Sequence, residues 1–233
     1  MQSRTRSASA RALRILVPVV AIWAHAWTGL APASAGPPDA AEALASLQSW
    51  LDGTRDLRGR FRQRLISGAL GRGVEESGRF WLERPGKMRW DYTDPERKVA
   101  ILDDGRTALY VAEDRQLWEG TLSGSDGILT ALLAGDRPLA EVFTISIVED
   151  PGSGQVLLLR LVPADASGTF EEVTLEVSTP EYAVTGAEVL DSAGNRIRYG
   201  FTRLERNRGI DAERFRLEVP PGTDVVRMDR TGG

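Results

Sequence analysis

The sequence predicts a mainly β protein of the α+β class, built on a curved antiparallel sheet with short helices on one face. Segments that alternate apolar and polar residues, or run apolar, recur along most of the chain, which is the pattern of strands. Turn-forming residues such as Asp150-Pro151-Gly152 and Ser192-Ala193-Gly194-Asn195 separate them, and only a few short stretches have helical spacing. Consecutive strands joined by such turns favour antiparallel pairing.

Residues 1–35 have the three parts of a secretory signal peptide. A basic segment with four arginines and no acidic residue precedes an apolar run, Ile15–Leu30, and Ala33-Ser34-Ala35 has the small side chains of a cleavage site. We therefore expect cleavage near Ala35, export, and a single domain over residues 36–233. An uncleaved membrane anchor is the less favoured alternative, because the apolar run is short and contains a proline and a histidine.

The composition excludes several classes of function. The chain has no cysteine, and its one histidine, His25, lies in the predicted signal peptide. The exported part therefore lacks the residues for a Ser-His-Asp triad, a cysteine nucleophile or an ordinary zinc site. Loss of the four arginines would change the net charge from −4 to −8. An acidic chain argues against non-specific binding to nucleic acid or anionic lipid surfaces.

The acidic clusters do not indicate catalysis. Asp103-Asp104-Gly105 lies between two apolar runs, where Asp-Gly is typical of a hairpin turn. The adjacent pairs Glu75-Glu76 and Glu171-Glu172 flank strands, where neighbouring side chains face opposite ways, so both are interpreted as solvated surface. Carboxylate-only or Ser-Lys chemistry stays open. We expect no enzyme activity, no cofactor and no metal.

The first two elements are a helix and a strand. Leu44, Leu47 and Leu51 recur at helical spacing, and Asp39 before them is an N-cap residue, so a helix is predicted over residues 40–52. From Leu57 onward, apolar and polar residues alternate with a period of two, which is the spacing of a strand. Four arginines (Arg58, Arg60, Arg62 and Arg64) occupy one face of this predicted strand, and Phe61 lies on the other face. A polyanion site is one interpretation of these arginines, and a solvated outer strand face is the preferred one.

A hairpin is predicted between Ser77 and Tyr92, around Pro85-Gly86. A three-residue loop over 85–87 puts Phe80 and Leu82 on the same face as Met88, Trp90 and Tyr92, whereas a two-residue loop would mix apolar and charged side chains. We therefore expect the three-residue register, with Trp81 on the opposite face. Arg84 then ends the apolar face. Its guanidinium keeps its proton, so it requires carbonyl or carboxylate acceptors there.

The remaining pattern is a meander interrupted by one helix. Strands are expected at Val99–Leu102, Thr107–Val111, Gln116–Trp118, Val142–Val148, Gln155–Val162, Phe170–Val177, Ala183–Leu190, Ile197–Leu204 and Arg214–Val219. A short helix is predicted to include Ile128, Leu129, Leu132 and Leu133, and to end at Gly135. Its apolar side fits ordinary core packing and a lid over a cavity equally well. Asp211 is expected to begin a helical turn, and Pro220-Pro221 to end the last strand.

The hairpin motif Ser77-Gly78-x-Phe80-x-Leu82-x-Arg84-Pro85-Gly86-Lys87-x-Arg89-Trp90-x-Tyr92, followed by Asp104-Gly105, resembles the LolA family of periplasmic lipoprotein carriers. Arg60-Phe61-Arg62-Gln63 resembles the family's first strand. Asp211-Ala212-Glu213-Arg214-Phe215 and Pro220-Pro221-Gly222-Thr223 resemble its closing segment. The similarity covers most of residues 40–227.

The resemblance implies an incomplete β-barrel covered by an α-helical lid, with a hydrophobic cavity between them. It implies a periplasmic carrier that takes acylated lipoproteins from an inner-membrane lipoprotein-releasing ABC transporter and delivers them to an outer-membrane receptor. Arg84 corresponds to the arginine that holds the lid closed through backbone carbonyls. The expected cavity lining is Phe61, Phe80, Leu82, Met88, Trp90, Tyr92, Leu129, Leu132 and Leu133. We expect a monomer that does not bind nucleic acid.

Three alternatives stay open at this point. A carrier of another lipid would use the same fold. A lipoprotein-sensing regulator of the same fold usually carries a second domain, for which the chain leaves little room. An unrelated β-rich enzyme would have to work without histidine or cysteine.

Overall fold

The computed structural model describes residues 39–69, 71–121, 129, 132–135, 137–149, 155–164 and 170–228. These residues belong to one unit of the chain, Gly36–Gly233. The predicted signal peptide and most of the predicted helix before Gly135 lie outside the described residues. Within the described ranges, no helix is both long enough and apolar enough to cross a bilayer.

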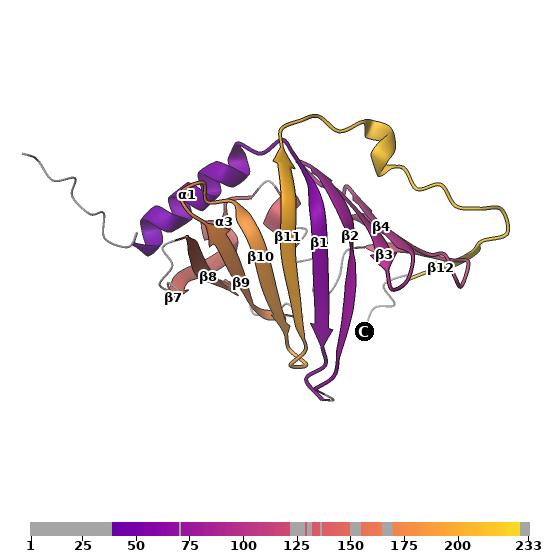
Figure 1. Cartoon of the computed structure of the whole chain (residues 1–233), viewed down its shortest axis with the longest axis horizontal. Helices are drawn as coiled ribbons and strands as arrows, with labels where there is room; N and C mark the ends of the chain where they lie inside the picture. The colour runs from indigo at the N-terminus through magenta and orange to yellow at the C-terminus, as the bar shows by residue number, and fades with distance from the viewer. Residues whose placement is uncertain are drawn as a thin grey trace, which may run out of the picture. The chain divides into compact units, whose positions relative to one another are not determined.

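Strands dominate the described structure (Figure 1). The elements are α1 (Ala40–Asp52), β1 (Asp56–Ile66), β2 (Gly73–Glu83), β3 (Lys87–Asp94), β4 (Lys98–Asp103), β5 (Arg106–Val111), β6 (Gln116–Thr121), α3 (Leu139–Val142), β7 (Phe143–Glu149), β8 (Val156–Pro163), β9 (Phe170–Ser178), β10 (Val184–Asp191), β11 (Arg196–Arg206), the 3₁₀ helix η1 (Ala212–Phe215) and β12 (Asp224–Arg227). The predicted fold class is confirmed.

All of these strands form one curved sheet of 12 strands, ordered β12-β6-β5-β4-β3-β2-β1-β11-β10-β9-β8-β7. Neighbouring strands pair antiparallel, except that β12 runs parallel to β6. The two ends of this order, β12 and β7, are not neighbours, so the sheet stays open, as the predicted incomplete barrel requires. The pairing of β1 with β11 brings the early and late parts of the chain together at the middle of the sheet.

Helix α1 begins and ends as the sequence predicts. The Asp39 carboxylate accepts a hydrogen bond from the Glu42 N–H at 2.7 Å, which satisfies one of the free donors of the first turn. At the other end, Arg206 of β11 donates to the Trp50 carbonyl at 3.1 Å and to the Thr54 hydroxyl at 2.8 Å. A cation is favourable at a helix C-terminus, so this contact fastens α1 to the sheet.

The β2–β3 hairpin has the predicted alignment of faces, but its loop lies one residue earlier than predicted. Phe80 pairs with Trp90, and Leu82 pairs with Met88. Glu83 pairs with Lys87, so the three loop residues are 84–86 rather than 85–87. This places Arg84 in the turn instead of in the strand. Gly86 has φ +81°, a conformation that glycine adopts without strain.

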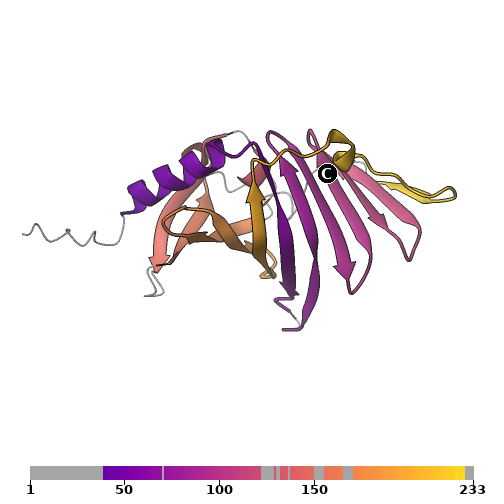
Figure 2. The ribbon, with the colours of Figure 1, turned by 45° about the horizontal axis from the view of Figure 1, so that its top comes forward.

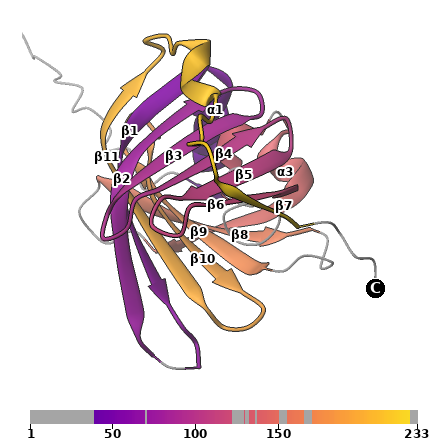
Figure 3. The ribbon, with the colours of Figure 1, turned by 90° about the vertical axis from the view of Figure 1, so that its right-hand side faces the viewer.

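The predicted strand Arg214–Val219 is wrong, and the strand that follows it was missed. After β11 the chain forms η1 and an irregular segment, and only then β12 (Figure 3). The Arg89 side chain of β3 donates to the backbone carbonyls of Arg214 and Arg216, each at 3.0 Å. A side chain thus satisfies these carbonyls in place of a strand ladder. Pro220 and Pro221 precede β12 instead of ending the last strand.

The main core lies on the side of the sheet that packs against α1, which we call the inner face. Figure 2 shows α1 beside the sheet. It is formed by inward-pointing side chains of β1–β3 and β8–β11, and by the apolar sides of α1 and α3. Ala43, Leu47, Trp50 and Leu51 are the buried residues of α1. The opposite side, the outer face, carries the alternate and mostly polar residues of the same strands, as expected for antiparallel strands with one covered face.

Candidate functional site

An aromatic cluster occupies the middle of the inner face. Trp90 is its centre, with ring centroids of Phe61 at 4.7 Å, Phe80 at 5.5 Å, Tyr199 at 5.8 Å and Phe201 at 6.2 Å. Phe61 meets Trp90 edge to face, at an interplanar angle of 87°. Such arrangements suit the quadrupoles of the rings and add to the energy of burial.

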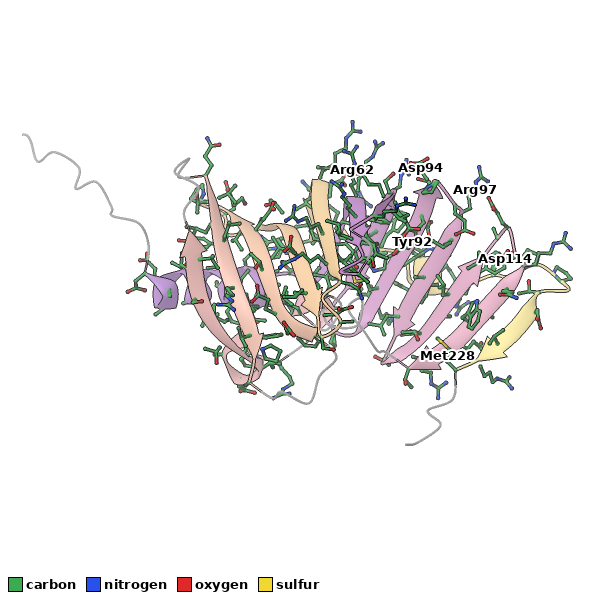
Figure 4. The ribbon with its side chains drawn as sticks, turned by 90° about the horizontal axis from the view of Figure 1, so that it is seen from below. Arg62, Tyr92, Asp94, Arg97, Asp114 and Met228 are labelled. Atoms are coloured by element: carbon green, nitrogen blue, oxygen red, sulfur yellow. The ribbon has the colours of Figure 1, made fainter. Side chains whose placement is uncertain are left out.

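Tyr92 extends this cluster and supplies a polar edge. Its ring meets Phe61 at 4.9 Å, and its hydroxyl donates to the Gln63 side-chain oxygen at 3.1 Å. The ammonium of Lys98 lies 4.8 Å from the centre of the Tyr92 ring and pairs with Glu76. Tyr92 is buried on the inner side of β3, whereas Arg62 of β1 is exposed; both are labelled in Figure 4.

The β8–β10 half of the inner face is aliphatic. Leu159, Leu161, Val173, Leu175 and Val189 have no exposed surface. Branched aliphatic side chains on facing strands pack closely and leave no polar group to satisfy. The inner face therefore joins an aromatic half to an aliphatic half.

All nine predicted lining residues belong to this buried cluster, and each is at most 9% exposed. They include Leu129, Leu132 and Leu133, which come from the segment before Gly135. Tyr199, Phe201 and the aliphatic residues of β8–β10 were not among the predicted lining residues. Their alternation along the predicted strands was the available signal. Contact of any of these side chains with a bound ligand stays a prediction.

Arg84 joins the β2–β3 turn to the segment that carries these leucines. Its guanidinium donates a hydrogen bond to the carbonyl oxygen of Gly135. Beside it, the Gly86 N–H donates to the Ala134 carbonyl at 2.9 Å. The backbone N–H of Arg84 is itself held by the Arg55 carbonyl at 2.8 Å. A fixed turn therefore presents two donors to the last carbonyls of this segment, where a cation is electrostatically favoured.

The helical cover is fastened in two further places. The Gln48 side chain of α1 accepts a hydrogen bond from the Leu139 N–H at the start of α3, at 2.9 Å. Arg206 holds the end of α1 against β11 through the contacts described above. We use the name lid for α1, α3 and the residues 129 and 132–135. Arg84 is the side chain that ties the lid to the β2–β3 turn.

The acidic clusters lie in structural positions. Asp104 and Gly105, both with positive φ, form the two-residue turn between β4 and β5. Glu76 and Glu172 each pair with a basic residue, Lys98 and Arg160 respectively. The part of the chain that the structure describes contains no group of histidine, cysteine, aspartate and glutamate residues that could hold a metal ion.

Comparison with known proteins decides the family of the chain. Residues 52–218 match the family model "Outer membrane lipoprotein carrier protein LolA". The chain belongs to the LolA family. The outer-membrane lipoprotein carrier protein of Methylococcus capsulatus is 34% identical over 181 residues, which cover 77% of this chain and 85% of the relative. The protein of the same name from Cupriavidus necator is 30% identical over 195 residues, covering 82% and 90%.

Solved structures give a weaker likeness. A LolA superfamily protein from Nitrosomonas europaea superposes with a TM-score of 0.46 at 10% identity, over 78% of this chain and 99% of the other. LolA membership therefore rests on the sequence relationship. It agrees with the open 12-stranded sheet and its few short helices.

Proposed function

We propose that this protein holds the acyl chains of lipoproteins against its apolar inner face and shuttles them between an inner-membrane releasing ABC transporter and an outer-membrane receptor. The observation that carries the proposal is the hydrogen bond from Arg84 to Gly135, because it fastens a lid over an apolar surface. The curated relatives are named lipoprotein carriers. The role is one of binding and release, without a chemical step.

The inner face suits acyl chains in its chemistry. Each methylene taken from water into an apolar site contributes about 0.8 kcal/mol, so long chains bind strongly wherever a continuous apolar surface receives them. The aliphatic residues of β8–β10 and the rings around Trp90 provide such a surface. Met88, which is fully buried beside them, has a flexible side chain that adapts to a partner of variable shape.

Entry of a lipid requires the lid to move, since the lining residues are buried beneath it. Opening breaks the Arg84–Gly135 and Gly86–Ala134 hydrogen bonds. A hydrogen bond to a charged group is worth about 1.5–3 kcal/mol, and a neutral one about 1 kcal/mol. A few buried methylenes offset that loss. The two bonds therefore favour a closed empty state, which lipid can displace and which re-forms to expel it at the receptor.

The test is transfer of a radiolabelled lipoprotein in two stages. Spheroplasts would release cargo to the added protein, and the isolated complex would then be mixed with membranes that contain the receptor. We expect Arg84→Leu to accept cargo in the first stage and to retain it in the second, because the closed state has lost its charged hydrogen bond. Arg97→Leu is the matched control, because Arg97 is exposed and distant in sequence from the lid.

Two results would overturn the proposal. The first is transfer by Arg84→Leu at the wild-type rate. The second comes from intact mass measurement of the protein isolated from its own periplasm. Bound triacylated protein supports a lipoprotein carrier, whereas bound free lipid would assign the inner face to another lipid.

A further inference from the structure

The outer face of the sheet carries a groove across β11, β1, β2 and β3. One hollow of about 880 Å³ and a second of about 390 Å³ share the side chains of Arg60, Arg79, Trp81 and Arg214 in their walls. Three of these come from the sheet, and Arg214 comes from η1. We call the two hollows together the arginine groove. It lies on the opposite side of the sheet from the lid.

Across the described strands, Arg60 and Arg62 have no acidic residue directly opposite, whereas Arg79 faces Asp91 of β3. Arg60 is directly opposite Arg79 on one side and Thr202 on the other. Arg62 lies between Ser77 and Gly200. Like charges directly opposite each other on neighbouring strands destabilise a sheet. The register itself therefore concentrates positive charge in a chain whose net charge is −4.

The two carboxylates that line the groove are already paired. Asp91 binds Arg89 at 2.6 Å, and Glu205 binds Arg58 at 2.5 Å. Within the described ranges, Arg60, Arg62, Arg79, Arg203 and Arg214 make no ion pair. Arg214 instead lies over the Trp81 ring, 4.7 Å from its centre, a contact that leaves its N–H donors available.

We propose that the arginine groove binds an acidic peptide segment of a partner protein. Guanidinium groups present paired N–H donors that match the two oxygens of a carboxylate. Between them the groove has the neutral hydroxyls of Ser77, Thr93 and Thr202, which can bond a peptide backbone. Its floor is open at Gly200, where an added Cβ would meet nothing within 4 Å. An extended chain can therefore approach the sheet closely.

The dimensions favour a peptide over the other anions. A single phosphate fills only a small part of 880 Å³ and would contact few of the arginines at once. A bilayer surface is flat and would meet the exposed rim, whereas Gly200 lies on the floor. Because the groove and the lid are on opposite faces, this docking does not depend on the proposed lipid carriage.

The experiment is fluorescence anisotropy of a labelled peptide of alternating glutamate and glycine, titrated with the purified protein at low ionic strength. We expect saturable binding, weakened about tenfold or more in Arg60→Gln/Arg79→Gln, since each charged hydrogen bond is worth about that factor. Arg97→Gln/Arg106→Gln removes the same charge from exposed positions outside the groove, and should bind as the wild type does. A glutamine-glycine peptide should not bind.

The outcomes separate the possible occupants. Equal binding by the two double variants would overturn the proposal, because attraction would then follow net charge and not the groove. So would groove-dependent binding of inorganic phosphate or of phosphatidylglycerol vesicles without binding of the peptide. The unfolding midpoint of the groove variant serves as the folding control. It should stay close to that of the wild type, because the substitution removes the like-charged pair Arg60–Arg79 and also the opposite-charged neighbours Arg79 and Asp91.

Discussion

The guanidinium of Arg84 donates a hydrogen bond to the carbonyl oxygen of Gly135, 51 residues later in the chain. The bond joins a turn of the sheet to the end of the segment that buries Leu129, Leu132 and Leu133. Because the neighbouring Gly86–Ala134 bond uses backbone atoms alone, Arg84 is the part of this junction that a substitution can remove.

Loss of the Arg84 bond should raise the affinity for apolar ligands. Arg84→Leu weakens the closed empty state by about 1.5–3 kcal/mol, and the apparent affinity of a ligand rises as the competent open state gains population. We expect a naphthylamine dye to bind about tenfold more tightly or better, measured by fluorescence titration. Arg97→Leu should match the wild type. Unchanged or weaker dye binding by Arg84→Leu would contradict this mechanism.

Two tryptophans nine positions apart, Trp81 and Trp90, test the assignment of the inner and outer faces of the sheet. Trp90→Ala removes the centre of the aromatic cluster, and should lower the free energy of unfolding by about 3–5 kcal/mol. Trp81 is half-buried on the outer face and contacts Arg214. Trp81→Ala should cost less than about half as much. Urea denaturation measures both values, and equal losses would mean that the two faces are wrongly assigned.

Gly78 should tolerate no side chain, although it lies within a strand. A Cβ at this position would be 1.9 Å from the Asp91 carbonyl oxygen and 2.9 Å from the Phe61 ring. Gly78→Ala should therefore lower the free energy of unfolding by more than about 2 kcal/mol. Gly200→Ala is the matched control. It enters open space, and the change should lie within about 1 kcal/mol in either direction. Similar results for the two variants would argue against the close approach at Gly78.

Glu188 should contribute to the acid sensitivity of the fold. Burial raises the pKa of its carboxyl, but hydrogen bonds and charges from Arg198 and Arg196 more than offset this and bring the pKa below its ordinary value of 4.5. Because the folded pKa is the lower one, the stabilisation is complete above the ordinary value and is lost as the pH falls through the folded pKa.

Glu188→Gln should consequently lose less stability than the wild type between neutral pH and about pH 3, by well under about 1 kcal/mol because the arginines are exposed. Urea titrations at several pH values provide the measurement. Glu205→Gln is a comparison in another exposed ion pair. A steeper acid loss in Glu188→Gln than in the wild type would reverse the assigned sign.

The sequence was sufficient to predict the faces of the sheet, since a period of two leaves only two choices for each side chain. It predicted Phe80, Leu82, Met88 and Trp90 together, and it predicted that Arg84 needs acceptors. It did not predict the exact loop. A loop over 84–86 and a loop over 85–87 both place the same side chains on the same face of the hairpin. The alternation of apolar and polar residues is therefore compatible with both loops.

The C-terminal segment shows where local pattern fails. Arg214–Val219 alternates like a strand, but its carbonyls bind Arg89 from a strand more than 100 positions earlier. Nothing within the segment indicates such a partner. The arginine groove had a local signal in the four alternate arginines of β1. Its other wall comes from β2 and η1, so only the folded chain brings Arg60, Arg79 and Arg214 to one place.

The pairing of β1 with β11 has a consequence for how the molecule is made. Leu57 pairs with Arg206, so the middle of the sheet is closed by strands from opposite ends of the sequence. A chain that emerges amino terminus first presents β1 to β6 long before β11 is available. Contacts of such wide sequence separation form slowly, because a long loop must be closed first. We therefore expect the pairing of β1 with β11 to govern the rate of folding. Until β11 is available, the unpaired edge of β1 is the edge that must be protected from aggregation.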